Sequence, residues 1–232
     1  MAQSQNPLAR FSQQFGFELA KIRFWQLAAF EPKEKSFGAT KSAPMYFADA
    51  IVPKDHPEYG KLWGILEEIT ANAFPGVLAD DVSWPLRDGD YVMAKAKAQD
   101  KDYPFLANTS ILSATSTLFV PKMSIVSGGK VEVLTGEARA LNSGKFYSGV
   151  EGTLVVNFVP WKGNNAARNA IPNSIKAYLQ EVCSLGTGAP LGGTGSGVSN
   201  FAKNIGAVTQ ENVASMRGRT RPGRSLDDEI PF

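Results

Sequence analysis

Apolar and polar positions in the first part of the chain form a pattern that predicts extended strands. From Phe17 to Phe30 apolar and aromatic residues dominate, and we interpret the middle of this stretch as a long strand. Its alternation is imperfect, so a helix is the alternative. The segment from Phe37 to Val52 favours a second extended element, in which Pro44 indicates an edge or a bulge.

The next segment has the spacing of a helix. Asp55 can cap its N-terminus, and Pro57 and Glu58 suit the first turn. Pro75-Gly76 ends the pattern. Apolar residues recur between these limits at helical spacing: Leu62, Ile65, Leu66 and Ile69.

The middle of the chain returns to strand-like composition. We interpret Trp84 to Ala98 as the turn Arg87-Asp88-Gly89-Asp90 followed by a strand. Residues from Tyr103 to Val126 are rich in Thr, Ser, Ile, Leu and Phe, which favours strands. Ser127-Gly128-Gly129-Lys130 predicts a turn.

The strongest strand pattern lies between Phe146 and Phe158, where Leu154, Val156 and Phe158 alternate with Val155 and Asn157. A last strand is predicted from Ser174 to Leu185. Several strands with one internal helix predict a mainly β fold, an OB-like five-stranded barrel with an inserted α-helix.

Composition divides the chain into a core with two tails. Residues 1–16 form a polar N-terminal arm, and residues 17–185 form the barrel domain. Residues 186–232 have the composition of a flexible Gly/Arg-rich linker, which predicts a disordered C-terminal tail. Arginines cluster near its end: Arg217, Arg219, Arg221 and Arg224.

Charge and composition narrow the function. The 232 residues carry a formal net charge of +2, so a nucleic-acid site would need local clusters of Lys and Arg. The single cysteine, Cys183, cannot form an intrachain disulfide, which suits a reducing compartment. The lone histidine, His56, has no second His and no Cys pair with which to form a zinc site. No apolar run of about 18 residues occurs. We therefore expect a cytoplasmic protein without metal or cofactor.

Sequence motifs of enzymes are missing. The chain has no P-loop and no nucleophile elbow. Asp80-Asp81 and the pair Asp88 and Asp90 could bind a metal ion, although Asp88-Gly89-Asp90 is more simply a turn. We expect a protein that binds rather than catalyses, and a metal-dependent nuclease is a minor alternative.

Aromatic rings beside cations supply the candidate binding chemistry. Trp161-Lys162 lies at a strand end, and Arg168 follows in the same loop. Such a ring can stack on a base while cations neutralise phosphates. The alternative is that Trp161 closes the barrel core. Lys95 and Lys97 alternate on a predicted strand and would share a face, which could line a groove or simply face solvent.

The last residues form an acidic tip, Asp227-Asp228-Glu229-Ile230-Pro231-Phe232. A basic pocket can hold such carboxylates while an apolar pocket takes the ring. This tip resembles the C-terminal tip of bacterial single-stranded DNA-binding proteins. The resemblance implies that the tip recruits replication and recombination proteins, such as a polymerase, a helicase-primase or an exonuclease.

Patches of the core resemble phage single-stranded DNA-binding proteins. They are Tyr147-Ser148-Gly149 with Gly152, Asn157-Phe158-Val159-Pro160-Trp161, Gly163-Asn164, and Trp84 to Asp90. The resemblance implies an OB-fold core that binds single-stranded DNA without sequence preference, with Trp161 as the stacking residue. Pro121 to Val126 follows the family pattern only loosely, so Lys122 is a weaker DNA contact.

The resemblance implies a role in phage DNA replication, recombination and repair. A different hypothesis is a protein-interaction adaptor that displays the tip and binds no nucleic acid. The sequence leaves homo-oligomerisation open.

Overall fold

The computed structural model describes residues 15–34, 36–37, 40–163 and 172–191. Most of the predicted N-terminal arm, most of the predicted tail, Arg168 and the acidic tip lie outside these residues, and the last two residues predicted for the arm, Phe15 and Gly16, already belong to the first strand. The strands are β1 (Phe15–Lys33), β2 (Ser36–Phe37), β3 (Thr40–Lys41), β4 (Met45–Pro53), β5 (Leu86–Asp88), β6 (Thr109–Ser116), β7 (Lys122–Ser127), β8 (Lys130–Val133), β9 (Glu151–Trp161) and β10 (Ser174–Ser184). The helices are α1 (Tyr59–Ala73), α2 (Gly89–Lys97) and α3 (Gly136–Leu141), with short 3₁₀ turns η1 (Ala79–Asp81), η2 (Pro104–Leu106) and η3 (Ser143–Lys145).

Strand β1 pairs with two different strands along its length. Its first half pairs with β9, from Phe15 to Arg23, and its second half pairs with β4, from Arg23 to Lys33. The pairing with β9 shifts register between Leu19 and Ile22, where Lys21 has a φ of 56°. This irregularity bends the strand, because an extra residue on one strand locally increases twist.

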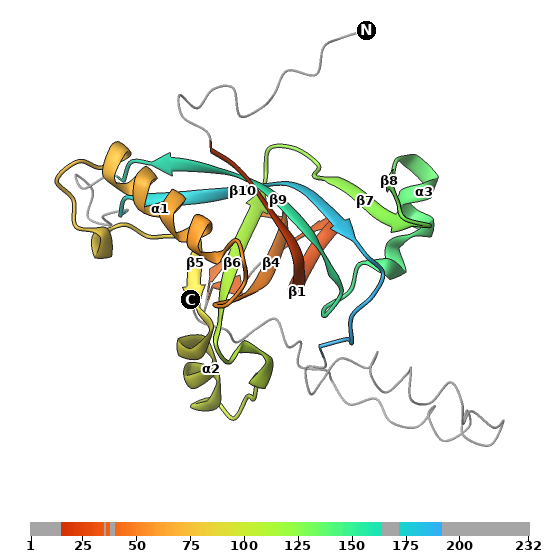
Figure 1. Ribbon diagram of the computed structural model, residues 1–232, viewed down its shortest axis with the longest axis horizontal. Coiled ribbons are helices and arrows are strands. Elements are labelled where there is room, and N and C mark those ends of the chain that lie inside the picture. The colour runs from red at the N-terminus through yellow and green to blue at the C-terminus, as the bar shows by residue number, and fades with distance from the viewer. Residues whose placement is uncertain (1–14, 35, 38–39, 164–171, 192–232) are drawn as a thin grey trace, which may run out of the picture.

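The bend allows the sheet to close on itself. The strands run in the order β6, β4, β1, β9 and β10, and a parallel pairing of β10 with β6 completes a closed five-stranded barrel. Strand β5 pairs with β6, and β7 and β8 extend the sheet beyond β10. Figure 1 shows α1 at one end of the barrel and the β7–β8 hairpin with α3 at the other. The predicted OB-like barrel is therefore confirmed.

The barrel interior is filled with apolar side chains from alternate positions. In β9 these are Leu154, Val156 and Phe158, as the alternation predicts. Helix α1 adds a buried stripe of Leu62, Leu66 and Ile69 to the same core. Small barrels are packed by their own side chains and leave no channel. Binding chemistry must consequently lie on the outer surface or in the loops.

Several predicted elements agree with the structure. The long first strand, the closing strand and the turn at Gly128-Gly129 all form. Phe74 ends α1 as its C-cap, directly before Pro75-Gly76. The second extended segment is only partly right, because β4 begins at Met45 after Pro44 and β2 pairs with β3 in a separate small sheet. Cys183 is buried.

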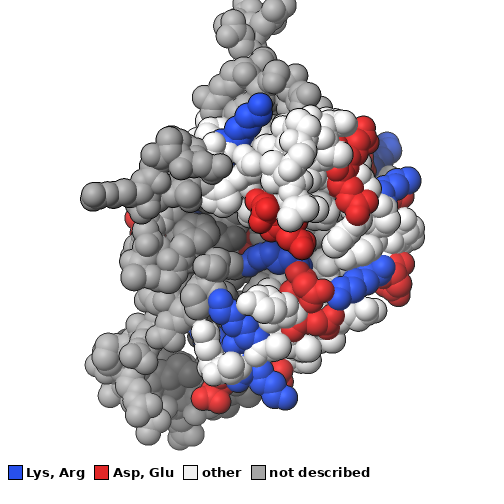
Figure 2. All heavy atoms as spheres, turned by 90° about the vertical axis from the view of Figure 1, so that its left-hand side faces the viewer, with Lys and Arg blue, Asp and Glu red and all other residues white. Residues whose placement is uncertain are grey.

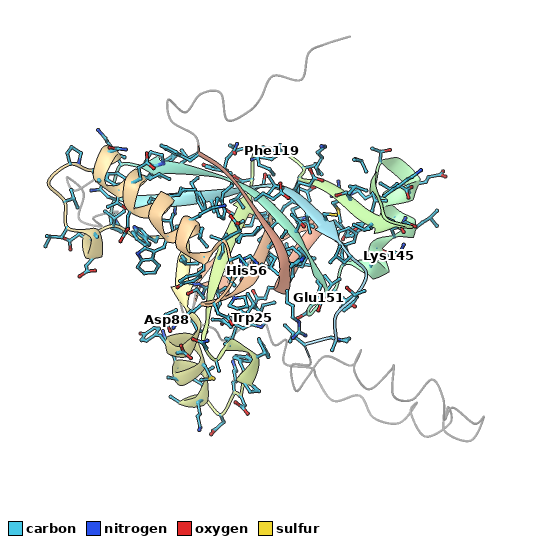
Figure 3. The ribbon with its side chains drawn as sticks, viewed as in Figure 1. Trp25, His56, Asp88, Phe119, Lys145 and Glu151 are labelled. Atoms are coloured by element: carbon cyan, nitrogen blue, oxygen red, sulfur yellow. The ribbon has the colours of Figure 1, made fainter. Side chains whose placement is uncertain are left out.

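The predicted cap of α1 is wrong. Glu58 is the N-cap residue, and its side chain makes no capping hydrogen bond. The amide N–H of Glu58 instead donates to Nδ1 of His56, at 3.1 Å. The other ring nitrogen, Nε2, then carries the proton and donates to the carbonyl of Ala20 at 2.9 Å. The imidazole thus joins the start of α1 to the bend of β1 (Figure 3).

The strand predicted after Asp90 is also wrong, because the chain forms helix α2 there. Asp88 accepts a hydrogen bond from the amide N–H of Tyr91 and so caps the helix. The alternating Ala and Lys residues that suggest a strand are strong helix formers. Gly89 begins the helix against Thr109, where a Cβ atom would lie 2.4 Å from the Thr109 hydroxyl oxygen.

The Tyr147-Ser148-Gly149 patch holds the end of the described chain to the barrel. Ser148 donates to the carbonyl of Trp25, and Tyr147 donates to the carbonyl of Gly188. Gly149 has a φ of 102°, and a Cβ atom there would lie 2.2 Å from the carbonyl oxygen of Ala189. The first residues of the predicted linker therefore lie against the barrel as far as Leu191. No helix in the described part of the chain could cross a membrane.

Replacing His56 with Ala should lower the free energy of unfolding by about 1–2 kcal/mol, because it removes the partners of the Glu58 amide and the Ala20 carbonyl together. Urea unfolding followed by circular dichroism measures the change. Glu68→Ala, at an exposed position of the same helix, is the control and should change stability by less than about 0.5 kcal/mol. Equal effects of both substitutions would contradict this role of His56.

Candidate nucleic-acid interface

A second apolar cluster lies outside the barrel, on the face of β1, β4 and β6. Its buried members are Trp25, Ile51, Leu106 and Ile111. The Trp25 ring meets Tyr103 edge-on with centroids 5.3 Å apart, and Phe105 at 6.1 Å. Helix α2 and the turn η2 pack over this cluster through Val92, Met93 and Phe105.

A cavity of about 330 Å³ opens beside this cluster. We call it the α2 cavity. Its walls combine aromatic rings with cationic side chains: Trp25, Tyr91 and Tyr103, with Arg87, Lys95 and Lys101. Tyr91 is 68% exposed and extends the aromatic surface outward. In Figure 3 the labelled Trp25 and Asp88 lie where α2 meets the barrel.

Arg87 is held at the wall of this cavity by neighbours on the strands. It donates to the hydroxyl of Ser113 at 2.9 Å and lies 3.8 Å from the carboxylate of Asp49. Burial lowers the pKa of the Arg87 guanidinium, and the Asp49 carboxylate opposes that shift. Burial also raises the pKa of the Tyr103 hydroxyl, so that group stays a neutral donor.

An ion-pair network fixes α2 on the barrel. Lys54, which follows β4, lies 2.8 Å from the carboxylates of both Asp88 and Asp90. Asp90 also accepts from the amide N–H of Asn108, just before β6. The hydrogen bonds from Lys54 hold the pKa of each carboxyl below its usual range, and the two carboxylates raise the pKa of Lys54.

The predicted stacking residue lies on the surface. Trp161 is the last residue of β9 and is 43% exposed, so it does not close the barrel core. Lys162 is exposed beside it. The base of the following loop is held by Asn173, whose side-chain oxygen accepts from the amide N–H of Gly163 at 3.0 Å.

One chain segment connects Trp161 with the α2 cavity. Trp161 pairs with Ser174, and Ser174 forms a bridge with Ser83. The chain from Ser83 to Arg87 spans at most about 14 Å. The Trp84 to Asp90 patch noted in the sequence overlaps this segment, which links two places where rings and cations occur together.

The structure separates other predicted contacts. Lys95 and Lys97 do not share a face, because side chains at positions i and i+2 of an α-helix project about 200° apart around its axis. Lys95 lines the α2 cavity, and Lys97 is not among its lining residues. Lys122 begins β7 and pairs with Glu181 at 3.5 Å. Along β10, Glu181 and Ser174 are about 23 Å apart, so Lys122 is remote from Trp161.

Sequence reasoning missed Trp25, Tyr91 and Lys101 as candidate contacts. A signal for Tyr91 existed, because Asp88 is a good N-cap and Tyr91 and Lys95 are then four residues apart on one helix face. For Trp25 the pattern gives no signal. Its position outside the barrel depends on the register shift between Phe24 and Gln26.

The charges on the face drawn in Figure 2 are mixed. Figure 2 shows Lys and Arg side chains close to Asp and Glu side chains, without a broad patch of one sign. No group of three or more His, Cys, Asp or Glu side chains in the described residues could hold a metal ion. The Asp88 and Asp90 pair has Lys54 as its cation, and its backbone is the end of β5 and the start of α2 instead of an isolated turn.

The barrel topology defines an OB-type protein. The family described as the ssDNA-binding protein of Enterobacter phage Enc34 matches residues 17–213, and the chain belongs to this family.

Solved structures of the phage Enc34 protein have a similar fold. The single-stranded DNA-binding protein of bacteriophage Enc34 with a C-terminal truncation is 18% identical, with a TM-score of 0.54 over 76% of this chain and 88% of that chain. The same protein in complex with ssDNA is 17% identical, with a TM-score of 0.53 over 76% and 89%. The single-stranded DNA-binding protein gp2.5 of bacteriophage T7 gives 14% identity and a TM-score of 0.44 over 85% and 97%. A search of curated proteins gave no significant match.

The ion pairs of Lys54 with Asp88 and Asp90 make the free energy of unfolding depend on pH in the acidic range. Each carboxyl has a lower pKa in the folded chain than in the unfolded chain. Its contribution is complete above the unfolded pKa of about 4 and is lost as pH falls through the folded value. Lys54→Met should therefore lower stability at neutral pH and flatten the loss of stability below about pH 4.

Urea unfolding at a series of pH values measures this difference. Lys61→Met is the matched control, because Lys61 pairs with Glu58 on an exposed helix surface and should leave the acid profile unchanged. A Lys54→Met profile parallel to that of the unsubstituted protein would refute the role of the network.

Proposed function

We propose that this protein binds single-stranded DNA without sequence preference, and that the α2 cavity and the Trp161-Lys162 corner form its contact surface. Membership of the Enc34 ssDNA-binding protein family supports single-stranded DNA as the ligand. The location of the proposed DNA contact surface rests on one observation: aromatic rings and cationic side chains line the same cavity, outside β4 and β6. Binding makes and breaks no covalent bond.

The position of the cavity agrees with how OB barrels bind. In chain order, β4 and β6 are the second and third strands of the barrel, and the loop after Trp161 joins the fourth to the fifth. OB folds bind oligonucleotides on the face of the second and third strands and with that loop. Tyr91 and Trp161 would stack on bases, and Lys95, Lys101 and Lys162 would neutralise phosphates. We place Arg168 in the same loop, outside the described residues, among the phosphate contacts.

The direct experiment is a fluorescence-anisotropy titration of labelled oligo-dT and of a matching duplex over a salt series. We expect preference for the single strand and a linear fall of log K with log salt. Tyr91→Ala should weaken binding by about 5- to 150-fold, the range of one lost base stack, and Tyr91→Phe should retain most of the affinity.

The two lysines of α2 provide a matched pair for the same titration. Lys95→Gln should reduce the salt slope by about 0.7, because one phosphate contact is lost. Lys97→Gln removes the same charge from another side of the helix and should leave the slope unchanged. Equal effects of both would show that only overall charge matters and would reject the α2 cavity as the contact surface. Absence of single-strand binding at low salt would reject the function itself.

We further propose that the acidic tip recruits partner proteins during DNA replication, recombination and repair in the host cytoplasm. The residues concerned are Asp227, Asp228, Glu229, Ile230, Pro231 and Phe232. Carboxylates before a terminal ring suit capture by a pocket with a basic rim. The tip would act independently of the barrel surface that binds DNA.

Deleting residues 227–232 should abolish binding of a partner such as a replication polymerase and leave oligo-dT affinity within about twofold. Surface plasmon resonance with immobilised partner measures the first effect, and the anisotropy titration measures the second. Phe232→Ala is a smaller test of the ring alone. Partner binding that survives the deletion would exclude the tip as the recruiting element.

A further inference from the structure

The β7–β8 hairpin ends the sheet with an edge that is open in the described part of the chain. Strand β8 pairs with β7 and with no other described strand. All its residues are exposed, and its apolar side chains Val131 and Val133 are 64% and 47% exposed. In Figure 1 this hairpin lies at the other end of the barrel from α1 and far from α2.

The hydrogen-bonding direction of each residue in β8 follows from its pairing with β7. The amide N–H of Leu134 donates to the carbonyl of Met123, so Leu134 bonds toward β7. Bonding direction alternates along an antiparallel strand. Lys130 and Glu132 therefore also bond toward β7, and Val131 and Val133 direct their N–H and C=O groups to the open edge.

These outward groups restrict how a second β8 could pair with the first. In an antiparallel pair, residues that bond across the interface face each other. Val131 of one chain can therefore face residue 129, 131 or 133 of the other. If it faced residue 130 or 132, the N–H and C=O groups at the open edge would lack hydrogen-bond partners.

Charge selects among the permitted registers. When Val131 faces Val133, Glu132 faces its own copy, and when Val131 faces Gly129, Lys130 faces its own copy. When Val131 faces Val131, each Lys130 faces a Glu132 and each Val133 faces a Gly129. Opposite charges across a strand pair stabilise it and like charges destabilise it. One register alone combines backbone bonding with complementary charges.

We propose that two copies of this chain associate through β8, antiparallel and with Val131 facing Val131 across a twofold axis. The side chains of Val131 and Val133 then form an apolar strip on one face of the shared sheet, and two Lys130–Glu132 pairs lie on the other. Charged residues on short edge strands also protect against random pairing. Here their alternation is complementary to an identical antiparallel strand.

Charge reversal tests this register. We expect sedimentation velocity of the full chain, free of nucleic acid, to show a dimer that forms with rising concentration. Lys130→Glu alone and Glu132→Lys alone should each weaken association by roughly 10- to 100-fold, because each places like charges opposite one another. The double variant should restore association, since its charges are complementary again.

Mixing the single variants gives the sharpest result. The Lys130→Glu chain has two acidic residues in β8 and the Glu132→Lys chain has two basic ones, so a mixture should form heterodimers although neither variant self-associates. Glu68→Lys on α1, at an exposed position, is the control and should dimerise normally. A protein that stays monomeric at every concentration, or one whose dimer is indifferent to these reversals, would overturn the proposal.

The test is separate from that of DNA binding. Lys130 and Glu132 lie outside the α2 cavity, so the single variants should bind a short oligo-dT with unchanged affinity. Loss of that binding in both variants would also overturn the proposal, because it would show that the substitutions act on more than the β8 edge.

Discussion

The bend in β1 is the constraint on which the rest of the structure depends. One strand must pair with β9 and then with β4, and the register shift near Lys21 makes this change of direction. His56 holds the carbonyl of Ala20 at this point and the first amide of α1 at the same time. Barrel closure and the position of α1 across one end follow from this geometry. A flat β1 would leave an open sheet with exposed edges.

The sequence predicts correctly those elements in which the spacing of apolar residues and the intrinsic helix or strand propensity agree. The strand β9 and the helix α1 have clear periodicity and both form, although β9 begins at Glu151, not near Phe146, and α1 begins at Tyr59, beyond the predicted cap. Around Lys95 and Lys97 the two signals conflict, because polar and apolar residues alternate while Ala and Lys favour a helix. The Asp88 cap decides for the helix. The cap of α1 is not predictable from common capping residues, since the ring of His56 accepts the hydrogen bond from the amide N–H of Glu58.

The candidate site was only partly accessible from sequence, for a physical reason. Trp161 and Lys162 are neighbours in the chain, so their joint chemistry is visible directly. The α2 cavity combines Trp25 from β1, Arg87 from β5 and Tyr103 from a loop, and these come together through barrel closure. The near-neutral charge of the chain fits this arrangement. Some cations lie where rings already occur, and others, such as Lys54, are paired with carboxylates.

The barrel is closed unevenly. Between β4 and β6 the pairing is continuous from Tyr46 with Ser116 to Pro53 with Thr109, whereas β10 meets β6 through Ala177 with Ala114 and Tyr178 with Thr115 alone. Local opening begins where few backbone bonds must break. This short seam is consequently where the barrel yields first, and amide exchange should be fastest there among the barrel strands. The two sides of β6 therefore differ in how firmly they are held, because a long ladder joins it to β4 and only two residue pairs join it to β10.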